Sequence, residues 1–410
     1  MSSFKRRGPS ASAHASLPAT RISARNSSVV LTSTGVPSID ELLGGGLPLH
    51  TSLLVNEDRF TGYAKLLMSY YIAQGVASGH AVSLATADED PESIIRGLMG
   101  VVEGKVPSEM KEEEEDEDVT LGAGGAAVLS GRRMGATRND VGNDRMQIAW
   151  RYQGLPRFST AVGGAGPARA GTLSQQTPFC NLFDLTKRMT PAMLKAAGSQ
   201  MALLDISAWA LEAEETGSDN VFQRLIRHIE GLVDEGGFRI RPNGPPPPTL
   251  LRIAIHSIAS PLWGSSTISQ LSTFFLSLRS ILRTSYATAF ISLPNAIPPH
   301  VTTILSHLSD GVLRLDSFAG SSTPVHSAYE SQYHGFLDIV KVPRVASLGG
   351  RIGEMGMLGF KVRRKRFLVE RCTLPPEGEG VRRGDEEEGS NRKARSSCGT
   401  VGTGNNPLDF

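Results

Sequence analysis

One segment, residues 31–67, constrains the fold of this chain more than any other. It reads LTSTGVPSIDELLGGGLPLHTSLLVNEDRFTGYAKLL. Hydroxyl residues followed by Pro37 mark the start of a helix, and three glycines beginning at Gly44 mark its end. The apolar run 53–55 then predicts a central strand, and apolar residues at helical spacing from Tyr63 predict a second helix. The segment is therefore helix, glycine-rich bend, buried strand, loop and helix, in that order.

The loop between that strand and the second helix lies where a phosphate-binding loop, G-x-x-x-x-G-K-[ST], would stand. In that motif the lysine reaches the phosphates and the last hydroxyl binds Mg²⁺. With Gly62 aligned to the second glycine, the lysine position holds Tyr63 and the hydroxyl position holds Ala64. Glu57 replaces the first glycine, and carboxylates repel phosphate. The positions of this degenerate loop are Glu57, Asp58, Arg59, Thr61, Gly62, Tyr63 and Ala64.

The order of these parts resembles the opening of RecA/KaiC-type ATPases. Their second nucleotide-binding element, the Walker B strand, ends in an aspartate that holds the Mg²⁺ water. The strand-like run 252–257, RIAIHS, resembles it, but His256 stands at the aspartate position. Neutral imidazole is a poor ligand for Mg²⁺, which prefers oxygen. Asp205, at the end of MALLD, is an alternative carboxylate, and an aspartate capping the next turn explains it equally well.

Six further strings follow residues 31–67 in order: MQIAWRYQGLPRF (146–158), FCNLFDLTKRM (179–189), LLRIAIHSIASPLWG (250–264), DGVLRLDSFAGS (310–321), YHGFLDIVKVPRVASL (333–348) and LGFKVRRKRFLVERCTLPPE (358–377). Together the seven strings resemble the PAXNEB family, the fourth subunit of the Elongator complex. The likeness covers nearly all of the chain outside its tails and one insertion.

The resemblance implies a RecA-like subunit that forms a heterohexameric ring with the fifth and sixth Elongator subunits. It implies that this ring binds tRNA and assists a catalytic subcomplex that modifies wobble uridine (U34). The chain itself would then be an accessory subunit without a cofactor, in the cytoplasm and nucleus, and any weak ATPase activity would belong to the assembled ring. The alternative is an autonomous RecA/KaiC-like ATPase, which needs the lysine and aspartate that this sequence lacks in register.

Composition limits the remaining classes of function. The formal net charge of +1 over 410 residues argues against an isolated RNA-binding module, which would be strongly basic. Cys180, Cys372 and Cys398 are too scattered for a disulfide framework or a C-x-x-C zinc site. No apolar run reaches 18 residues, so we expect an intracellular protein with no membrane partner.

The chain divides into one predicted domain and three predicted disordered segments. Residues 1–28 are rich in Ser, Ala and Arg and form a predicted tail, as do residues 377–410. Between them, 29–376 is the predicted RecA-like domain. It carries an acidic insertion at about 103–143, where the like charges of 112–118 repel one another.

Within the predicted domain, short apolar runs alternate with amphipathic stretches. The strand-like runs are 80–87, 201–206, 250–256, 287–293 and 311–315, and the helical stretches include 91–98, 220–233 and 269–283. This alternation predicts an α/β fold with a mostly parallel sheet covered by helices. After Tyr333 the apolar period becomes two, which predicts antiparallel strands appended at the sheet edge.

The basic run 361–366, KVRRKR, is the strongest local charge feature. It is open to three interpretations: a solvated hairpin tip, a nuclear-import signal, or a patch that contacts tRNA phosphates. The first is the default, because basic runs of this length are frequent on surfaces. The candidate tRNA-binding residues are Arg363, Arg364, Lys365 and Arg366.

Overall fold

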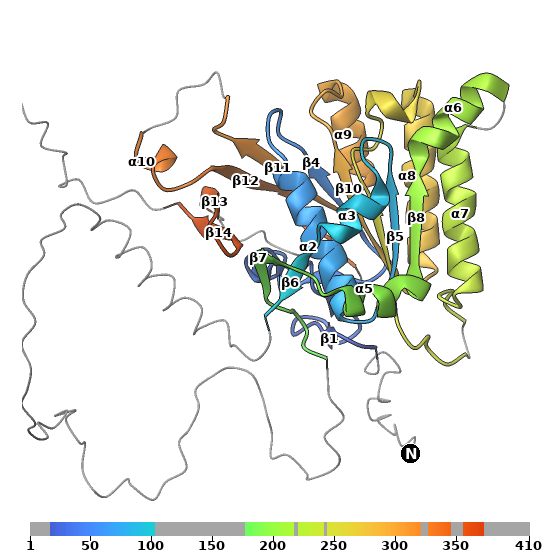
Figure 1. The fold of residues 1–410 in the computed structure, drawn as a ribbon, viewed down its shortest axis with the longest axis horizontal. Coiled ribbons are helices and arrows are strands. Elements are labelled where there is room, and N and C mark those ends of the chain that lie inside the picture. Colours follow the sequence, from blue (N-terminus) through green and yellow to red (C-terminus); the bar gives the residue numbers. More distant parts are fainter. Residues whose placement is uncertain are drawn as a thin grey trace, which may run out of the picture. The chain divides into compact units, whose positions relative to one another are not determined.

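The computed structural model describes residues 17–102, 177–216, 220–241, 244–320, 327–345 and 356–372. All of these belong to one compact unit, and a second unit, residues 373–410, lies outside the described part. The centre of the first unit is a nine-stranded sheet in the order β14-β13-β12-β11-β4-β10-β9-β5-β8 (Figure 1).

Six neighbouring strands of this sheet run parallel. They are β4 (Ser52–Asn56), β5 (Ala81–Thr86), β8 (Met201–Asp205), β9 (Leu251–Ile255), β10 (Ala287–Leu293) and β11 (Gly311–Ser317). Three antiparallel strands extend the sheet beyond β11: β12 (Gly335–Lys341), β13 (Leu358–Val362) and β14 (Phe367–Arg371). The predicted fold class, a mostly parallel sheet covered by helices, is confirmed, including the central place of β4 and the appended antiparallel strands.

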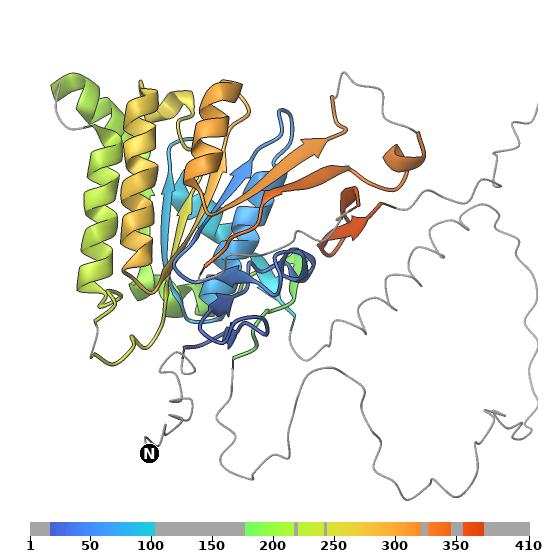
Figure 2. The same ribbon diagram turned by 180° about the vertical axis from the view of Figure 1, so that it is seen from behind.

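Helices cover both faces of the parallel strands. In Figure 1 the nearer face carries α2 (Tyr63–Ala77), α3 (Pro91–Arg96) and α5 (Pro191–Ala197). Figure 2 shows the opposite face, with α7 (Val221–Glu235), α8 (Ile268–Arg283) and α9 (Pro299–Leu308) in front of the sheet. The remaining helices are α1 (Pro37–Leu42), α6 (Ile206–Thr216) and the short α10 (Ser327–Glu330).

Strand β4 shows how the two faces are built from one apolar run. Successive side chains of a strand point to opposite faces. Accordingly Leu53 and Val55 pack in the core beneath α2, whereas Leu54 packs with α7, α8 and α9. All three are at most 1% exposed. A continuous apolar run is therefore what a strand buried on both faces requires.

Helix boundaries follow capping residues in the sequence. Asp90 caps α3 by accepting hydrogen bonds from two backbone N–H groups of its first turn. Asn220 caps α7 by accepting one hydrogen bond, from the backbone N–H of Phe222. At α8, Thr267 and Gln270 form a reciprocal capping box.

The predicted disorder of residues 1–28 is wrong for residues 17–28. Strand β1 (Thr20–Ile22) pairs antiparallel with β2 (Val30–Thr32), which pairs with β3 (Leu47–Pro48). Leu17 is 4% exposed and packs with core residues that lie far along the chain. Strand pairing, the burial of Leu17 and a hydrogen bond from His80 to the Pro18 carbonyl hold a stretch whose overall composition predicts disorder.

The other predicted disordered segments, 103–143 and 377–410, lie outside the described residues. Strand β6 (Met99–Val101), which precedes the segment 103–143, pairs antiparallel with β7 (Phe183–Arg188), which follows it. No helix in the described ranges is long and apolar enough to cross a membrane.

Candidate functional site

The two halves of the degenerate nucleotide site meet at the carboxyl edge of the parallel strands. The loop 57–62 follows β4, and His256 follows β9. Strand β10 lies between β4 and β9, with Leu293 opposite Asn56 and Ile291 opposite Ile255. Ligands of open α/β sheets bind in the crevice outside this edge. The structure therefore brings the two predicted elements together where a nucleotide would bind.

Glu57 is held across the end of β10 by the segment that follows β9. Ser257 donates its hydroxyl hydrogen bond to the Glu57 carboxylate, with Oγ at 2.8 and 3.0 Å from the two oxygens. The Glu57 backbone N–H donates to the carbonyl of Leu293 at 2.9 Å. Ser257 has a left-handed φ of 45°, an unusual conformation for a residue with a side chain. A fixed carboxylate thus stands where the motif requires an open glycine.

The rest of the loop is closed on itself. Thr61 donates its hydroxyl to the carboxylate of Asp58, 2.7 Å from each oxygen. Phe60 is 60% exposed, and the Arg59 guanidinium lies 5.2 Å from the centre of its ring. A Cβ atom added at Gly62 would meet nothing within 4 Å, so close packing does not require glycine there. Asp58 is therefore bonded within the loop to Thr61, and the Arg59 guanidinium lies beside the Phe60 ring.

Tyr63, at the lysine position, packs against the appended strands. Its ring lies edge-on to Phe360 of β13 at 4.8 Å and tilted against Phe367 of β14 at 6.5 Å. Its hydroxyl lies 3.2 Å from Nδ1 of His334. Burial, and secondarily the charge of Asp58, raise the pKa of Tyr63. Tyr63 therefore anchors the β13–β14 hairpin on α2.

The neighbours of Tyr63 offer no substitute for the missing groups. Ala64 is 2% exposed and carries no hydroxyl for a metal. The Lys65 ammonium is paired with Glu89, 2.5 and 2.6 Å from its two carboxylate oxygens. The first turn of α2 therefore lacks both the lysine and the hydroxyl of the motif.

The second half of the site lacks its carboxylate as well. His256 is 7% exposed, and its Nδ1 lies 3.4 Å from the Thr86 hydroxyl. The alternative carboxylate, Asp205, ends the edge strand β8, which β5, β9 and β10 separate from β4. Asp205 accepts hydrogen bonds from the backbone and hydroxyl of Ser207 at 3.0 and 2.6 Å. The capping explanation is confirmed, and the Walker B alternative for Asp205 is wrong because the sheet order separates the strands.

A buried arginine gives the Ser-Thr-Gly opening a structural role. Arg252 of β9 is fully buried, and its NH2 group donates to the Thr32 hydroxyl at 2.7 Å and to the Ser33 carbonyl at 2.9 Å. The Asp40 carboxylate accepts from the Thr34 backbone and hydroxyl, each at 2.7 Å, and from the Ser33 hydroxyl. Burial raises the pKa of Asp40. The motif joins α1 to the central sheet, a structural role that needs no nucleotide.

Sequence reasoning missed this arginine. Its signal is a charged residue inside LRIAI, a run buried on both faces, because such a residue needs polar partners nearby. Among the described residues, no group of three or more His, Cys, Asp or Glu side chains could hold a metal ion.

The basic run forms the turn between β13 and β14, as predicted. The backbone N–H of Arg363 donates to the carbonyl of Arg366 at 2.9 Å. The Leu185 N–H of β7 donates to the carbonyl of Lys365 at 2.8 Å, which holds β7 beside the turn. Arg364 is exposed, and the other four basic side chains of the run are partly buried. Phe360 and Phe367, which flank the run, are buried in the core.

The chain is similar to known proteins over most of its length. Elongator complex protein 4 of Xenopus laevis is 33% identical over 407 residues, covering 96% of this chain and 92% of that protein. Elongator complex protein 4 of Homo sapiens is 32% identical over 437 residues, covering 100% and 94%. Among solved structures, a KaiC-like protein of Pyrococcus horikoshii aligns with a TM-score of 0.42 at 14% identity, over 83% of this chain and 99% of that one. The PAXNEB protein family matches residues 13–410, and the chain belongs to this family.

Proposed function

We propose that this chain is a non-catalytic RecA-like subunit of the Elongator complex. It forms a heterohexameric ring with the fifth and sixth subunits, and the ring binds tRNA and supports modification of U34 by the catalytic subcomplex. The complex acts in the cytoplasm and the nucleus. Support comes from the family, from relatives named Elongator complex protein 4, and from the closed nucleotide site.

The observation that carries the non-catalytic part is the packing of Tyr63. Its ring contacts Phe360 and Phe367, so a lysine at this position would remove aromatic contacts that hold the hairpin. Glu57, fixed by Ser257, adds a negative charge where phosphates would bind. Neither change is compensated by a nearby unpaired lysine, because Lys65 is paired with Glu89. The residue at the lysine position therefore has a structural role, because Tyr63 holds the hairpin against α2.

Calorimetric titration of the full-length chain with ATP and Mg²⁺ tests this part. We expect no binding tighter than millimolar, which corresponds to about −4 kcal/mol. Micromolar binding, about −8 kcal/mol, would contradict the proposal and favour an ATPase. A working ATPase of the same fold serves as the positive control for the assay.

Purification of the tagged native chain tests the assembly part. The expected stable partners are the other Elongator subunits, with the fifth and sixth subunits in equal amounts to this chain. Recovery of the chain as a stable monomer without them would contradict the ring. Its abundance in nuclear and cytoplasmic fractions of the same cells tests the proposed location.

The turn between β13 and β14 is the proposed tRNA contact. Phosphate contacts are independent of base sequence and depend on salt. Replacement of Arg363 and Arg364 by alanine should weaken binding of the assembled ring to all tRNAs alike. It should also lower the slope of log affinity against log salt by about 0.7 to 0.9 per lost contact. These two residues are preferred to Arg366, whose Nε is buried.

Alanine replacements of Arg96 and Arg224, surface arginines of α3 and α7, provide the matched control. This control removes two charges while leaving the turn intact, so affinity and slope should stay near those of the native ring. If the turn variant assembles normally and keeps its tRNA affinity and salt slope, the turn is a solvated surface.

A further inference from the structure

Strand β7 carries an enlarged bulge beside the basic turn between β13 and β14. Between two consecutive residues of β6, the pairing in β7 jumps from Asp184 to Arg188. Residues 185–187 therefore bulge out of the ladder. A bulge changes the direction of the side chains that it carries, and bulges are frequent next to functional sites. The contacts of residues 185–187 thus bear on what this surface does.

Asp184 holds the bulge in shape. One of its carboxylate oxygens accepts hydrogen bonds from the backbone N–H and the hydroxyl of Thr186, at 2.9 and 2.6 Å. Asp184 is 7% exposed, so its carboxylate lies beneath the surface. Burial raises the pKa of Asp184, but the bonds from Thr186 and the charges of two lysines outweigh burial and lower the pKa overall. The two lysines are Lys187 of the bulge and Lys365 of the turn, so both elements act on one buried carboxylate.

The bulge is bonded directly to the basic turn. The Leu185 N–H donates to the carbonyl of Lys365 at 2.8 Å, and Figure 1 shows β7 next to β14. Lys187 lies two residues from Leu185, and Arg364 is adjacent to Lys365. At most about 7 Å of chain on one side and about 4 Å on the other therefore separate these two cations from the bond. Lys187 and Arg364, both exposed, lie on neighbouring parts of one surface.

Lys187 and Arg364 are the cations of this surface that can offer donors to a ligand. Neither side chain makes a hydrogen bond or an ion pair with another residue in the described part of the chain. The other four cations of the turn already interact with the protein: Lys361, Arg363, Lys365 and Arg366. Lys187 is therefore available to an anionic ligand in the same way as Arg364.

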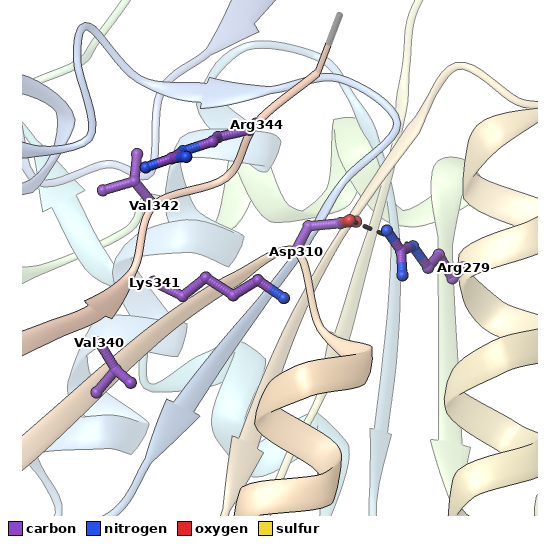
Figure 3. Close-up of a pocket in the computed structure, with 6 residues that line it drawn as sticks. All are labelled: Arg279, Asp310, Val340, Lys341, Val342 and Arg344. Atoms are coloured by element: carbon purple, nitrogen blue, oxygen red, sulfur yellow. Dashed lines mark ion pairs between the residues drawn. The ribbon is translucent and has the colours of Figure 1, made fainter. Parts of the chain in front are cut away.

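By contrast, the cations around a cavity of about 380 Å³ beside α8 are already bonded within the protein (Figure 3). Arg279 and Arg283 share one carboxylate oxygen of Asp310, at 3.4 and 2.6 Å. The Lys341 ammonium donates to three backbone carbonyls at the end of α9. Arg344, which also lines the cavity, has an interaction of its own. An anion in this cavity would have to compete with these bonds.

The aromatic side chains of β7, β13 and β14 are buried and cannot stack on bases. Phe183 is 3% exposed, Phe360 0% and Phe367 2%. Proteins that recognise unpaired RNA bases stack them on exposed aromatic rings. Contacts to phosphates need only suitable donors and carry no sequence information. The surface is therefore suited to the phosphate backbone of a nucleic acid and not to its bases.

We propose that the bulge of β7 and the turn form one surface that binds the phosphate backbone of tRNA, with Lys187 as a contact beside Arg364. It rests on the tRNA contact proposed for the turn and extends that contact to β7. Lys187 and Arg364 each neutralise a phosphate, and the bond from Leu185 to Lys365 keeps the bulge and the turn together. Asp184 is a positioning residue, because it fixes the bulge from beneath without reaching the RNA.

Binding of labelled tRNA to the assembled ring, measured at several salt concentrations, tests the proposal. Loss of one phosphate contact lowers the slope of log affinity against log salt by about 0.7 to 0.9, which weakens binding about five- to eightfold at 0.1 M salt. We expect this change for Lys187→Ala, and about twice the change in slope when Arg364→Ala is added. Lys187→Arg keeps the charge and should keep the slope.

Lys195→Ala is the matched control, because Lys195 of α5 is the next lysine along the chain and is also exposed. It should leave affinity and slope unchanged, and size-exclusion chromatography verifies that each variant assembles. If Arg364→Ala lowers the slope but Lys187→Ala does not, β7 lies outside the tRNA surface, which overturns the proposal and leaves the contact of the turn intact. If neither lowers the slope, the contact proposed for the turn is wrong as well. Equal effects of Lys187→Ala and Lys195→Ala would also overturn the proposal.

Discussion

Acidification should destabilise this protein through His80, a buried histidine held between two groups. Its Nδ1 accepts a hydrogen bond from Nε of Arg252 at 2.9 Å, so its Nε2 carries the proton and donates to the carbonyl of Pro18 at 3.0 Å. His80 is 1% exposed. Burial, and then the charge of Arg252, lower the pKa of His80 from 6.5 to about 3. The folded protein therefore keeps this imidazole neutral.

The sign of the effect follows from proton binding. Between pH 6.5 and about 3 the unfolded chain binds a proton at His80 that the folded chain refuses. The neutral imidazole of His80 therefore lowers the free energy of unfolding little above pH 6.5, and this free energy falls as the pH falls through this window. Between pH 7 and pH 5 the loss from this single group is about 2 kcal/mol. That is a large share of a typical stability of about 5–15 kcal/mol.

Urea unfolding of the native chain and of His80→Gln, each at pH 7 and pH 5, measures this contribution. Glutamine offers an oxygen to Arg252 and an amide to Pro18 but does not titrate. The loss of unfolding free energy between the two pH values should be about 2 kcal/mol smaller in the variant. His300→Gln, at an exposed position, serves as the control. Its free energy of unfolding should fall between the two pH values by as much as that of the native chain. Equal losses in His80→Gln and the native chain would refute the reasoning.

Two further predictions concern the same core. Arg252→Met should lower the free energy of unfolding by about 3–5 kcal/mol, because it leaves buried acceptors unpaired. Arg224→Met, at the surface, should lower it by less than about 1 kcal/mol, and urea unfolding measures both variants. Gly35→Ala and Gly79→Ala both place alanine at a positive φ, but Gly35→Ala should lower the melting temperature more. Its Cβ would lie 2.4 Å from the carbonyl oxygen of Tyr70, whereas a Cβ at Gly79 would meet nothing within 4 Å.

The order of the elements and the departures from the nucleotide-binding motif are readable from the sequence alone. Strand and helix periods, the glycine run from Gly44 and the caps are local features, so they predict elements without knowledge of their neighbours. The missing lysine at Tyr63 and the missing aspartate at His256 are also local facts. They mark departures from the nucleotide-binding motif before any contact is known.

The contacts made by the residues at these motif positions were decided only by the tertiary structure. The bond from Ser257 to Glu57 joins residues 200 positions apart, and Tyr63 packs on a hairpin nearly 300 residues later. Arg252 and His80 are likewise partners only because β9 and β5 are neighbours in the sheet. Local periodicity carries no information on such pairs, since strand order and register bring them together. The sequence therefore determined which motif residues are missing, and the packing determined what the residues at those positions contact.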